Sequence, residues 1–378
     1  MSKILIVGAG YVGIATGIVY FKHGHEVYFY DLNESKINEY KTRKLSFYEP
    51  GVFEHISNIN EKYFVSSLDL VDTLPEFVFI CVNTPSNDDG SVSIDALIKA
   101  VKDIFNKYDH SYTLIIKSTI PPGTCKLLKE FIPNNVTLIN NPEFLSQGTS
   151  IHDAFCPNRI VVGKNENDNI DQFMELLSIY KYRCKIVVTN HESAELAKYA
   201  SNAFLALKIS FINEMLQICE NVDANIEDVS KIMGLDPRIG HQFLKSGSGF
   251  GGPCFKKDVS GLAKIEEQYG IENGFAKLTN EFNEKHKEHL VDVLIKRHGS
   301  IKGLKICVTG LTYKLNTSSA MNAPSLKIIE RLIKEGAIVY AYDELVNKDE
   351  INIEFIDYET TLKECDHIVD CLGYKIIK

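Results

Sequence analysis

Cys254 is the residue of this chain whose surroundings best suit nucleophilic chemistry. It lies in the segment GFGGPCFKKD (Gly249–Asp258), between a glycine-dense loop and two lysines. Backbone amides and positive charge near a cysteine favour the thiolate, which is its nucleophilic form. Asp258 follows four residues later and would share a face with Cys254 if a helix begins there. Taken alone, such a segment is more often explained by a buried cysteine that acts as a small hydrophobic side chain.

A second glycine pattern, G-x-G-x-x-G, stands near the N-terminus. Gly8, Gly10 and Gly13 follow a predicted strand (Lys3–Val7) and open a predicted helix. In such a turn Gly8 permits the tight bend, Gly10 lets the backbone approach a pyrophosphate, and Gly13 packs helix against strand. The amides and dipole of the helix N-terminus would bind the anion. The pattern predicts a dinucleotide site, and a purely structural glycine turn is the alternative.

Asp31 indicates which dinucleotide would bind. It ends the second predicted strand (Glu26–Tyr30), eighteen residues after Gly13. A carboxylate at this place would accept a hydrogen bond from the ribose 2′-hydroxyl and would repel a 2′-phosphate. The sequence therefore favours NAD over NADP.

Three further polar residues could serve the same chemistry. Lys198 and Asn202 lie four residues apart and share one face of a predicted helix, where they could hydrogen-bond a sugar or an oxyanion. Glu143 follows a predicted strand, at the end where ligands of parallel sheets bind. The alternatives are an exposed lysine on an amphipathic helix and an ordinary loop carboxylate.

The elements that must position these residues follow an α/β pattern. Continuous apolar strands separated by helices predict a doubly wound, Rossmann-like parallel sheet covered on both faces. From about His191, some thirty residues without glycine or proline keep helical spacing, which we interpret as a connecting helix and a dimer seam. Further strands of the first sheet are predicted at Phe77–Thr84, Thr113–Thr119, Val136–Asn141, Arg159–Val162 and Lys185–Val188.

After residue 303 the opening pattern returns. LKICVTGL predicts a strand and turn, APSLKIIERLIKEGA a helix, and IVYAYDE and HIVDCLG two more strands. This echo predicts a second, smaller and shortened Rossmann-like domain. We therefore expect three domains, at residues 1–190, 191–300 and 301–378.

Composition excludes several classes of protein. The chain has 378 residues, is 44% hydrophobic and 24% charged, and carries a net charge of −9. Without a basic run, a nucleic-acid or acidic-membrane binder is not expected. Nine cysteines scattered singly, outside zinc-ligand spacing, indicate reduced thiols and no metal site. The sequence shows neither a signal-peptide pattern nor an apolar run near the ~20 residues that span a bilayer, so we expect a cytoplasmic protein.

Taken together, the motifs resemble the UDP-glucose/GDP-mannose dehydrogenase family. The match extends over nearly the whole chain in the family's order, and DPRIG followed by GFGGPCFKKD is similar to its UDP-glucose 6-dehydrogenase branch. The matching segments are VGAGYVG (Val7–Gly13), FYEPGV (Phe47–Val52), VNTP (Val82–Pro85), KST (Lys117–Thr119), NPEFLSQG (Asn141–Gly148), ELAKYASNAFLALKISFINE (Glu195–Glu214), DPRIG (Asp236–Gly240), GFGGPCFKKD (Gly249–Asp258) and GLTYKLNT (Gly310–Thr317).

The resemblance implies an activity. It implies an NAD domain, a dimerising central helix, a UDP-binding C-terminal domain, and oxidation of UDP-glucose to UDP-glucuronate by two NAD⁺ without a metal. Cys254 would hold the aldehyde as a thiohemiacetal that becomes a thioester. Donors on the central helix would stabilise oxyanions, and carboxylates would position or activate water. The other catalytic residues so implied are Lys198, Asn202, Asp258, Glu143 and Thr119.

The same resemblance implies two binding sets and a homodimer in which Arg238 reaches into the partner's site. The cofactor set is Gly8, Gly10, Tyr11, Val12, Gly13, Asp31, Lys36, Val82, Thr84, Pro85, Ser118 and Gln147. The substrate set is Glu143, Phe144, Leu145, Lys198, Asn202, Arg238, Phe243, Leu244, Lys245, Gly249, Tyr313 and Lys314.

Three departures separate the chain from the family pattern. Gln147 stands where the family usually has a glutamate, Met321 stands where it has an arginine against the NAD pyrophosphate, and the chain ends earlier. Two rival functions follow. A two-electron dehydrogenase of the 6-phosphogluconate or 3-hydroxyacid type would need no thiol, and a degenerate nucleotide-sugar binding protein would need no chemistry.

Overall fold

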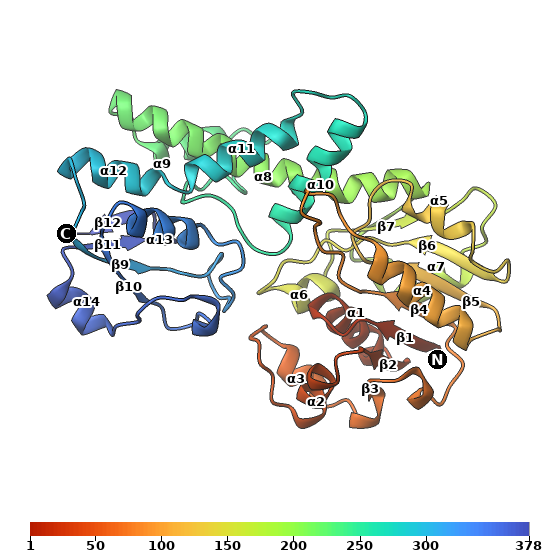
Figure 1. Ribbon diagram of the computed structural model, residues 1–378. Coiled ribbons are helices and arrows are strands. Elements are labelled where there is room, and N and C mark those ends of the chain that lie inside the picture. Colours follow the sequence, from red (N-terminus) through yellow and green to blue (C-terminus); the bar gives the residue numbers. More distant parts are fainter. Residues whose placement is uncertain (378) are drawn as a thin grey trace. The chain divides into compact units, whose positions relative to one another are not determined.

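The computed structural model describes residues 1–377 and divides into two compact units, Met1–Tyr199 and Ala200–Lys378 (Figure 1). The first unit is built on an eight-stranded sheet in the order β3-β2-β1-β4-β5-β6-β7-β8. Its strands pair in parallel except at β6 and β7, which run antiparallel. The predicted doubly wound sheet is confirmed. The strands are β1 (Lys3–Val7), β2 (Glu26–Tyr30), β3 (Phe64–Val65), β4 (Phe77–Ile80), β5 (Tyr112–Ile116), β6 (Val136–Asn140), β7 (Arg159–Gly163) and β8 (Lys185–Thr189).

Both faces of this sheet are covered, and the apolar side chains of its central strands alternate between the two faces. Ile4 and Ile6 of β1 belong to one buried cluster, and Leu5 and Val7 belong to the other. Side chains of α1, α2, α3, α6 and α7 fill the first cluster, and those of α4 and α5 fill the second. The helices are α1 (Tyr11–Lys22), α2 (Glu34–Thr42), α3 (Val52–Ile56), α4 (Asp95–Lys107), α5 (Thr124–Lys129), α6 (Ser150–Phe155) and α7 (Asp171–Leu176).

Two predicted strands end earlier than expected. β4 stops at Ile80 and β5 at Ile116, so the polar residues predicted at their ends lie in loops at the carboxyl edge of the sheet. There the carbonyl oxygens of Val82 and Thr119 accept hydrogen bonds from side-chain hydroxyls of the neighbouring loop, and the backbone no longer pairs with an adjacent strand. These loops therefore belong to the candidate site.

The second unit joins a helical region to a four-stranded sheet in the order β10-β9-β11-β12. β9, β10 and β11 pair in parallel as the sequence predicts, and β12 adds an antiparallel edge that was not expected. The elements are α9 (Ile226–Gly234), α10 (Phe255–Gln268), α11 (Phe275–His286), α12 (His289–His298), β9 (Lys305–Thr309), α13 (Pro324–Lys334), β10 (Ile338–Tyr342), α14 (Tyr358–Glu364), β11 (His367–Asp370) and β12 (Lys375–Ile377).

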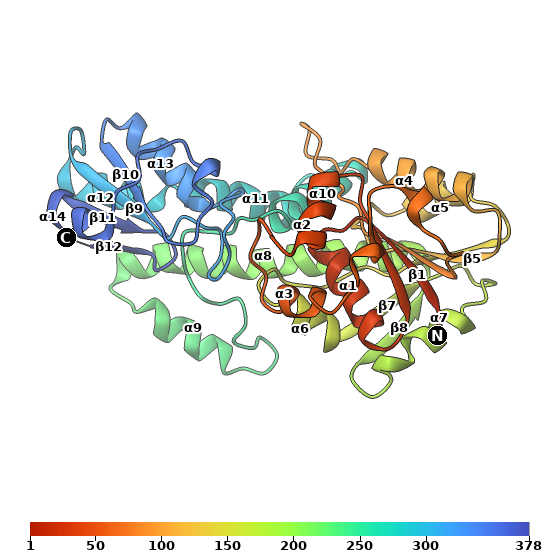
Figure 2. The ribbon, with the colours of Figure 1, turned by 90° about the horizontal axis from the view of Figure 1, so that it is seen from below.

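The long helix predicted from His191 is present as α8 (His191–Val222), a single uninterrupted helix (Figure 2). Its first turns belong to the first unit and the remainder to the second. Phe204, Phe211 and Ile218 recur every seven residues and are exposed. Among residues 1–377, no helix combines the length and apolarity needed to cross a membrane.

Candidate active site

The glycine turn lies where the strand order of the first sheet reverses, between β1 and β4. Gly8 has φ +98°, and a Cβ there would lie 2.7 Å from the carbonyl oxygen of Cys81, so only glycine fits. A Cβ on Gly13 would lie 2.0 Å from the Gly8 carbonyl oxygen, which explains the close packing of α1. A Cβ on Gly10 would meet no atom within 4 Å. The turn therefore leaves open space at the N-terminus of α1, where the anion of a dinucleotide is expected.

Asp31 is fixed at the rim of this turn. Its Oδ2 accepts hydrogen bonds from the Ala9 amide at 2.9 Å and from the Lys36 ammonium at 3.0 Å. Its Oδ1 accepts from the Asn33 amide at 2.9 Å. Asp31 and Lys36, which were both expected to bind the cofactor, thus form one ion pair beside the glycine turn.

The loops after β4 and β5 are joined by two side-chain bonds. The Ser118 hydroxyl donates to the carbonyl oxygen of Val82 at 2.7 Å, and the Thr84 hydroxyl donates to that of Thr119 at 2.8 Å. The candidate residues Val82, Thr84, Ser118 and Thr119 are therefore gathered at one edge of the sheet. Pro85 directly follows Thr84.

Glu143 and Lys198 form a buried ion pair. Glu143 Oε1 lies 2.8 Å from Lys198 Nζ, and the two side chains are 7% and 4% exposed. Glu143 Oε2 accepts from the Leu145 amide at 2.5 Å. The Phe144 ring lies beneath the cations of Lys198 and Arg159. The candidate carboxylate and the candidate cation are thus brought together from 55 residues apart.

Sequence reasoning missed three residues that support these loops. Glu49 accepts from the amides of Gly148 and Ser150 at 2.8 and 2.9 Å, which holds the turn that carries Gln147. Glu195 accepts from two amides at the start of α5, and burial raises the pKa of its carboxyl. Lys117 donates to the Asn141 side chain at 3.0 Å, and burial lowers the pKa of its ammonium. All three lie within sequence segments that resemble the family, and that resemblance is the signal by which they could have been found.

In the second unit, Cys254 is the residue that caps the N-terminus of α10. A helix does begin there, the condition under which Asp258 was expected to share a face with Cys254, and the amide of Asp258 donates to the Cys254 carbonyl oxygen at 2.8 Å. Asp258 is 1% exposed, and its two oxygens accept from Asn202 at 2.5 Å and from Lys257 at 2.6 Å. The candidate thiol, amide and carboxylate are therefore held around the first turn of α10. Burial of Asp258 is compensated by these two donors.

The glycines before Cys254 are required by close packing. Gly252 has φ +82°, and a Cβ there would lie 2.7 Å from the Tyr313 ring. A Cβ on Gly251 would lie 2.4 Å from the carbonyl oxygen of Asn322. The Gly252 amide donates to the Met321 carbonyl oxygen at 2.9 Å, whereas the Met321 side chain is half exposed. The segment that contains Tyr313 thus packs directly on the loop before Cys254. The Lys314 carbonyl oxygen accepts two threonine hydroxyls that fix the turn after it.

The rest of the substrate set is less tightly placed. The Arg238 guanidinium binds the carboxylate of Asp236 and its side chain is 87% exposed. Phe243 and Lys245 are exposed, and Leu244 is buried with its carbonyl oxygen bonded to Ser230.

The arrangement can support covalent redox chemistry. The first unit offers a buried amine–carboxylate pair, Lys198 with Glu143, and the second offers a thiol at a helix N-terminus one turn before a buried amide–carboxylate pair. Within residues 1–377, no group of three or more His, Cys, Asp or Glu side chains is arranged to hold a metal ion.

Comparison with known proteins identifies relatives along the whole chain. Three models of the UDP-glucose/GDP-mannose dehydrogenase family match: the NAD binding domain at residues 2–182, the central domain at 192–285 and the UDP binding domain at 307–374. UDP-glucose 6-dehydrogenase TuaD of Bacillus subtilis is 37% identical over 353 residues, which is 91% of this chain and 76% of TuaD. The UDP-glucose 6-dehydrogenase of Rhizobium meliloti is 36% identical over 90% of this chain and 81% of its own.

A solved structure shares the whole fold. The UDP-glucose dehydrogenase of Pyrobaculum islandicum superposes with a TM-score of 0.91 at 29% identity, over 99% of this chain and 90% of that one. The likeness extends through both units of the structure.

Proposed function

Because the chain belongs to the UDP-glucose/GDP-mannose dehydrogenase family, we propose that this NAD-dependent oxidoreductase is a UDP-glucose 6-dehydrogenase that makes UDP-glucuronate by two successive oxidations. The observation that carries the proposal is the surroundings of Cys254. The thiol stands at the N-terminus of α10 behind glycines that nothing larger can replace, one turn before a buried Asp258–Asn202 pair. An oxidation that removes only two electrons would not need this thiol.

The residues of the first unit fit a bound NAD. The open space beside Gly10 accepts a pyrophosphate, and Asp31 accepts a ribose hydroxyl. Lys36 partly neutralises Asp31, and the loops with Val82, Thr84 and Ser118 line the carboxyl edge of the sheet. NAD⁺, when bound, accepts the hydride that the alcohol carbon must lose.

The chain's own side chains divide the remaining work. After C6 has lost a hydride and its hydroxyl a proton, the Cys254 sulfur bonds to the aldehyde carbon and the thiol proton passes to the oxygen. Lys198 and Asn202 donate to the oxyanions that develop in these steps. After the second oxidation gives a thioester, Glu143 takes a proton from the water that releases the acid, and Asp258 and Thr119 orient water and protons. Two NAD⁺ are consumed for each UDP-glucose.

Stoichiometry tests this route. Purified protein with NAD⁺ and UDP-glucose should form two NADH for each UDP-glucose consumed. Cys254→Ala should stop formation of the acid, because no thioester can form, whereas Cys156→Ala at an exposed cysteine should change nothing. One NADH per sugar would favour the two-electron dehydrogenase. Tight binding of UDP-sugars without NAD⁺ reduction would favour a binding protein, and full glucuronate production by Cys254→Ala would falsify the covalent step.

We further propose that the protein is a homodimer through α8 and α9. Phe204, Phe211 and Ile218 form an exposed apolar stripe on α8, and Ile232 and Leu235 at the end of α9 are about two-thirds exposed. A second copy of the chain would bury these side chains. Phe211→Glu should halve the molar mass measured by light scattering. Phe275→Glu, at a phenylalanine of α11 that is 72% exposed, is the matched control and should leave the molar mass unchanged. A monomeric parent protein would refute the proposal.

A further inference from the structure

The segment that precedes Cys254 is clamped by buried side chains. The Gly247 amide donates to Asn213 Oδ1 of α8 at 2.8 Å, and the Gly247 carbonyl oxygen bonds His286 Nε2 of α11 at 2.7 Å. Asn283, one turn earlier on α11, accepts from the Phe250 amide at 2.8 Å and donates to its carbonyl oxygen at 3.1 Å. Asn213, Asn283 and His286 are 1–2% exposed. Both ends of the stretch 247–250 are therefore fixed by side chains rather than by a sheet or helix.

His286 occupies one tautomer. A carbonyl oxygen can only accept, so Nε2 must carry the proton that bonds Gly247. The amide of Gln217 lies 2.9 Å from Nδ1 and donates to it. Burial lowers the pKa of His286 to about 4, so the ring is neutral near pH 7. The ring also makes stacked contacts with Phe282, His289 and Tyr374, at centroid distances of 5.6, 5.6 and 5.9 Å.

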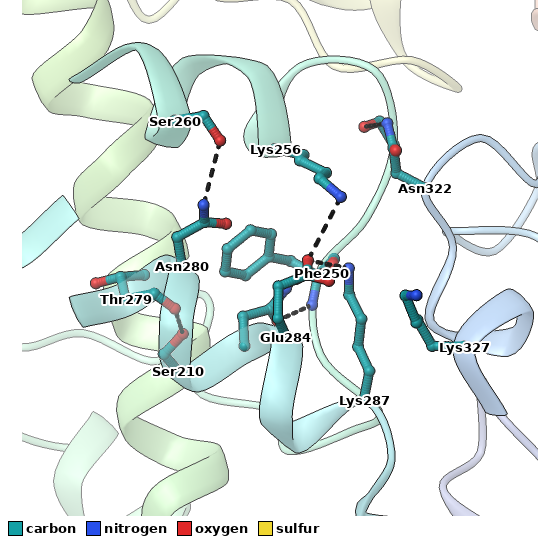
Figure 3. Close-up of polar contacts among 12 residues, drawn as sticks. Ser210, Phe250, Lys256, Ser260, Thr279, Asn280, Glu284, Lys287, Asn322 and Lys327 are labelled. Carbon is teal, nitrogen blue, oxygen red and sulfur yellow. Dashed lines mark hydrogen bonds and ion pairs between the residues drawn. The ribbon is translucent and has the colours of Figure 1, made fainter. Parts of the chain in front are cut away.

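Glu284 of α11 also reaches the chain just after Cys254. Lys287, 2% exposed, bonds Glu284 at 2.7 Å, and Lys256 of α10 reaches the same carboxylate at 3.7 Å (Figure 3). Lys256 is the second residue after Cys254. One face of α11 therefore contacts the chain on both sides of Cys254. Loss of these contacts would release the backbone on either side of Cys254.

We propose that His286 is a positioning residue: through its bond to Gly247 it sets the place of Cys254 so that the aldehyde is captured before it dissociates. The inference rests on the proposed function. Capture forms the bond between the Cys254 sulfur and C6, and the thiol proton moves to the aldehyde oxygen. A misplacement of about 1 Å costs about a hundredfold in such a step, so an unclamped thiol lets aldehyde escape after the first oxidation.

The test compares three variants. His286→Phe keeps the stacked ring but removes the donor to Gly247, and His286→Gln places an amide nitrogen near the position of Nε2. His289→Gln is the matched control, because His289 stacks on His286 and bonds Glu220 but makes no bond to the loop. Hydrogen–deuterium exchange of the peptide 247–254 should be about tenfold faster in His286→Phe, and near the parent rate in the other two.

The second readout is the product ratio. Quenching with sodium borodeuteride converts released aldehyde to deuterium-labelled UDP-glucose. In His286→Phe, NADH per UDP-glucose consumed should fall from two toward one while labelled UDP-glucose appears, and His286→Gln should restore two. This ratio does not depend on how much protein is folded, so a merely structural defect would leave it at two.

The proposal is overturned if exchange at 247–254 is unchanged in His286→Phe, or if the ratio stays at two. If His286→Phe does not fold, Gln217→Met replaces it in the comparison, because this variant removes the donor to His286 Nδ1. Both the exchange rate of 247–254 and the NADH ratio should then change in the same direction as expected for His286→Phe, but by a smaller amount. A parent protein that forms no NADH would overturn the proposed function instead. The exchange comparison would then still decide whether His286 holds the loop.

Discussion

Removing either partner of the Glu143–Lys198 pair should destabilise the protein strongly. The two side chains are 7% and 4% exposed, with 2.8 Å between Glu143 Oε1 and Lys198 Nζ, so truncating one removes the opposite charge that faces the other away from water. Breaking such a buried pair costs about 3–5 kcal/mol. At about 2–4 °C per kcal/mol for a domain of this size, Lys198→Met or Glu143→Gln should lower the melting temperature by about 6–20 °C.

The double variant separates pairing from packing. Glu143→Gln with Lys198→Met removes both charges, so its loss of stability should be much smaller than the sum of the two single losses. Calorimetry of the four proteins gives the coupling energy. The matched control is the exposed pair Lys99–Asp103, whose side chains are 64% and 37% exposed and whose loss should cost less than about 1 kcal/mol. Additive losses at Glu143 and Lys198 would refute the reasoning, because they would mean that the two charges do not interact.

Three further predictions concern the cofactor and pH. Asp31→Ala should raise the ratio of kcat/KM for NADP⁺ to kcat/KM for NAD⁺. The carboxylate that repels the 2′-phosphate is then absent, and Lys36 loses its ion-pair partner. Equal use of both cofactors by the parent protein would contradict the assignment of NAD. Met321→Arg should increase the affinity for NAD⁺ about ten- to a hundredfold by one charge-assisted hydrogen bond and leave the affinity for UDP-glucose unchanged. The Met321 side chain is half exposed, and only its backbone bonds Gly252. If calorimetric titration finds unchanged NAD⁺ binding in a folded variant, the cofactor lies elsewhere. Finally, the pKa of His286 is about 4 in the folded protein, below its ordinary value of 6.5. The unfolded chain therefore binds more protons than the folded protein as the pH falls below 6.5. The free energy of unfolding should decrease by about 2 kcal/mol between pH 7 and pH 5. His286→Gln should lack this part of the acid sensitivity, and identical melting curves against pH in both proteins would exclude it.

The sequence predicts those parts of the site that depend on local chemistry. The glycine turn and the acidic end of the second strand each follow from a few neighbouring residues, and the structure has both. The partner of Asp31 could also be found, because Lys36 is only five residues away. Strand ends were placed too late at Thr84 and Thr119. Apolar content alone does not reveal at which residue the backbone stops pairing with the next strand and instead accepts hydrogen bonds from side chains of a neighbouring loop.

Contacts between distant segments could not be predicted in the same way. Nothing near Glu49 in the sequence indicates that it binds amides about a hundred residues away, and nothing near His286 points to Gly247. These are buried polar groups whose partners are chosen by the folded backbone, since each must be satisfied wherever it lies. For the same reason, the sequence around Asn213 and Asn283 does not distinguish them from ordinary helix residues.

The Glu143–Lys198 pair also bears on the order of the proposed steps. An ammonium has three hydrogens, so Lys198 can bond Glu143 and a substrate oxygen together, but a developing oxyanion would draw it away from the carboxylate. Glu143 Oε1 would then be available to accept a proton from water, at the stage where the thioester must be hydrolysed. The coupling energy from the double variant should therefore be smaller with UDP-glucose bound than without it. An equal or larger coupling in the complex would mean that Lys198 stays with Glu143 and that another donor serves the oxyanion.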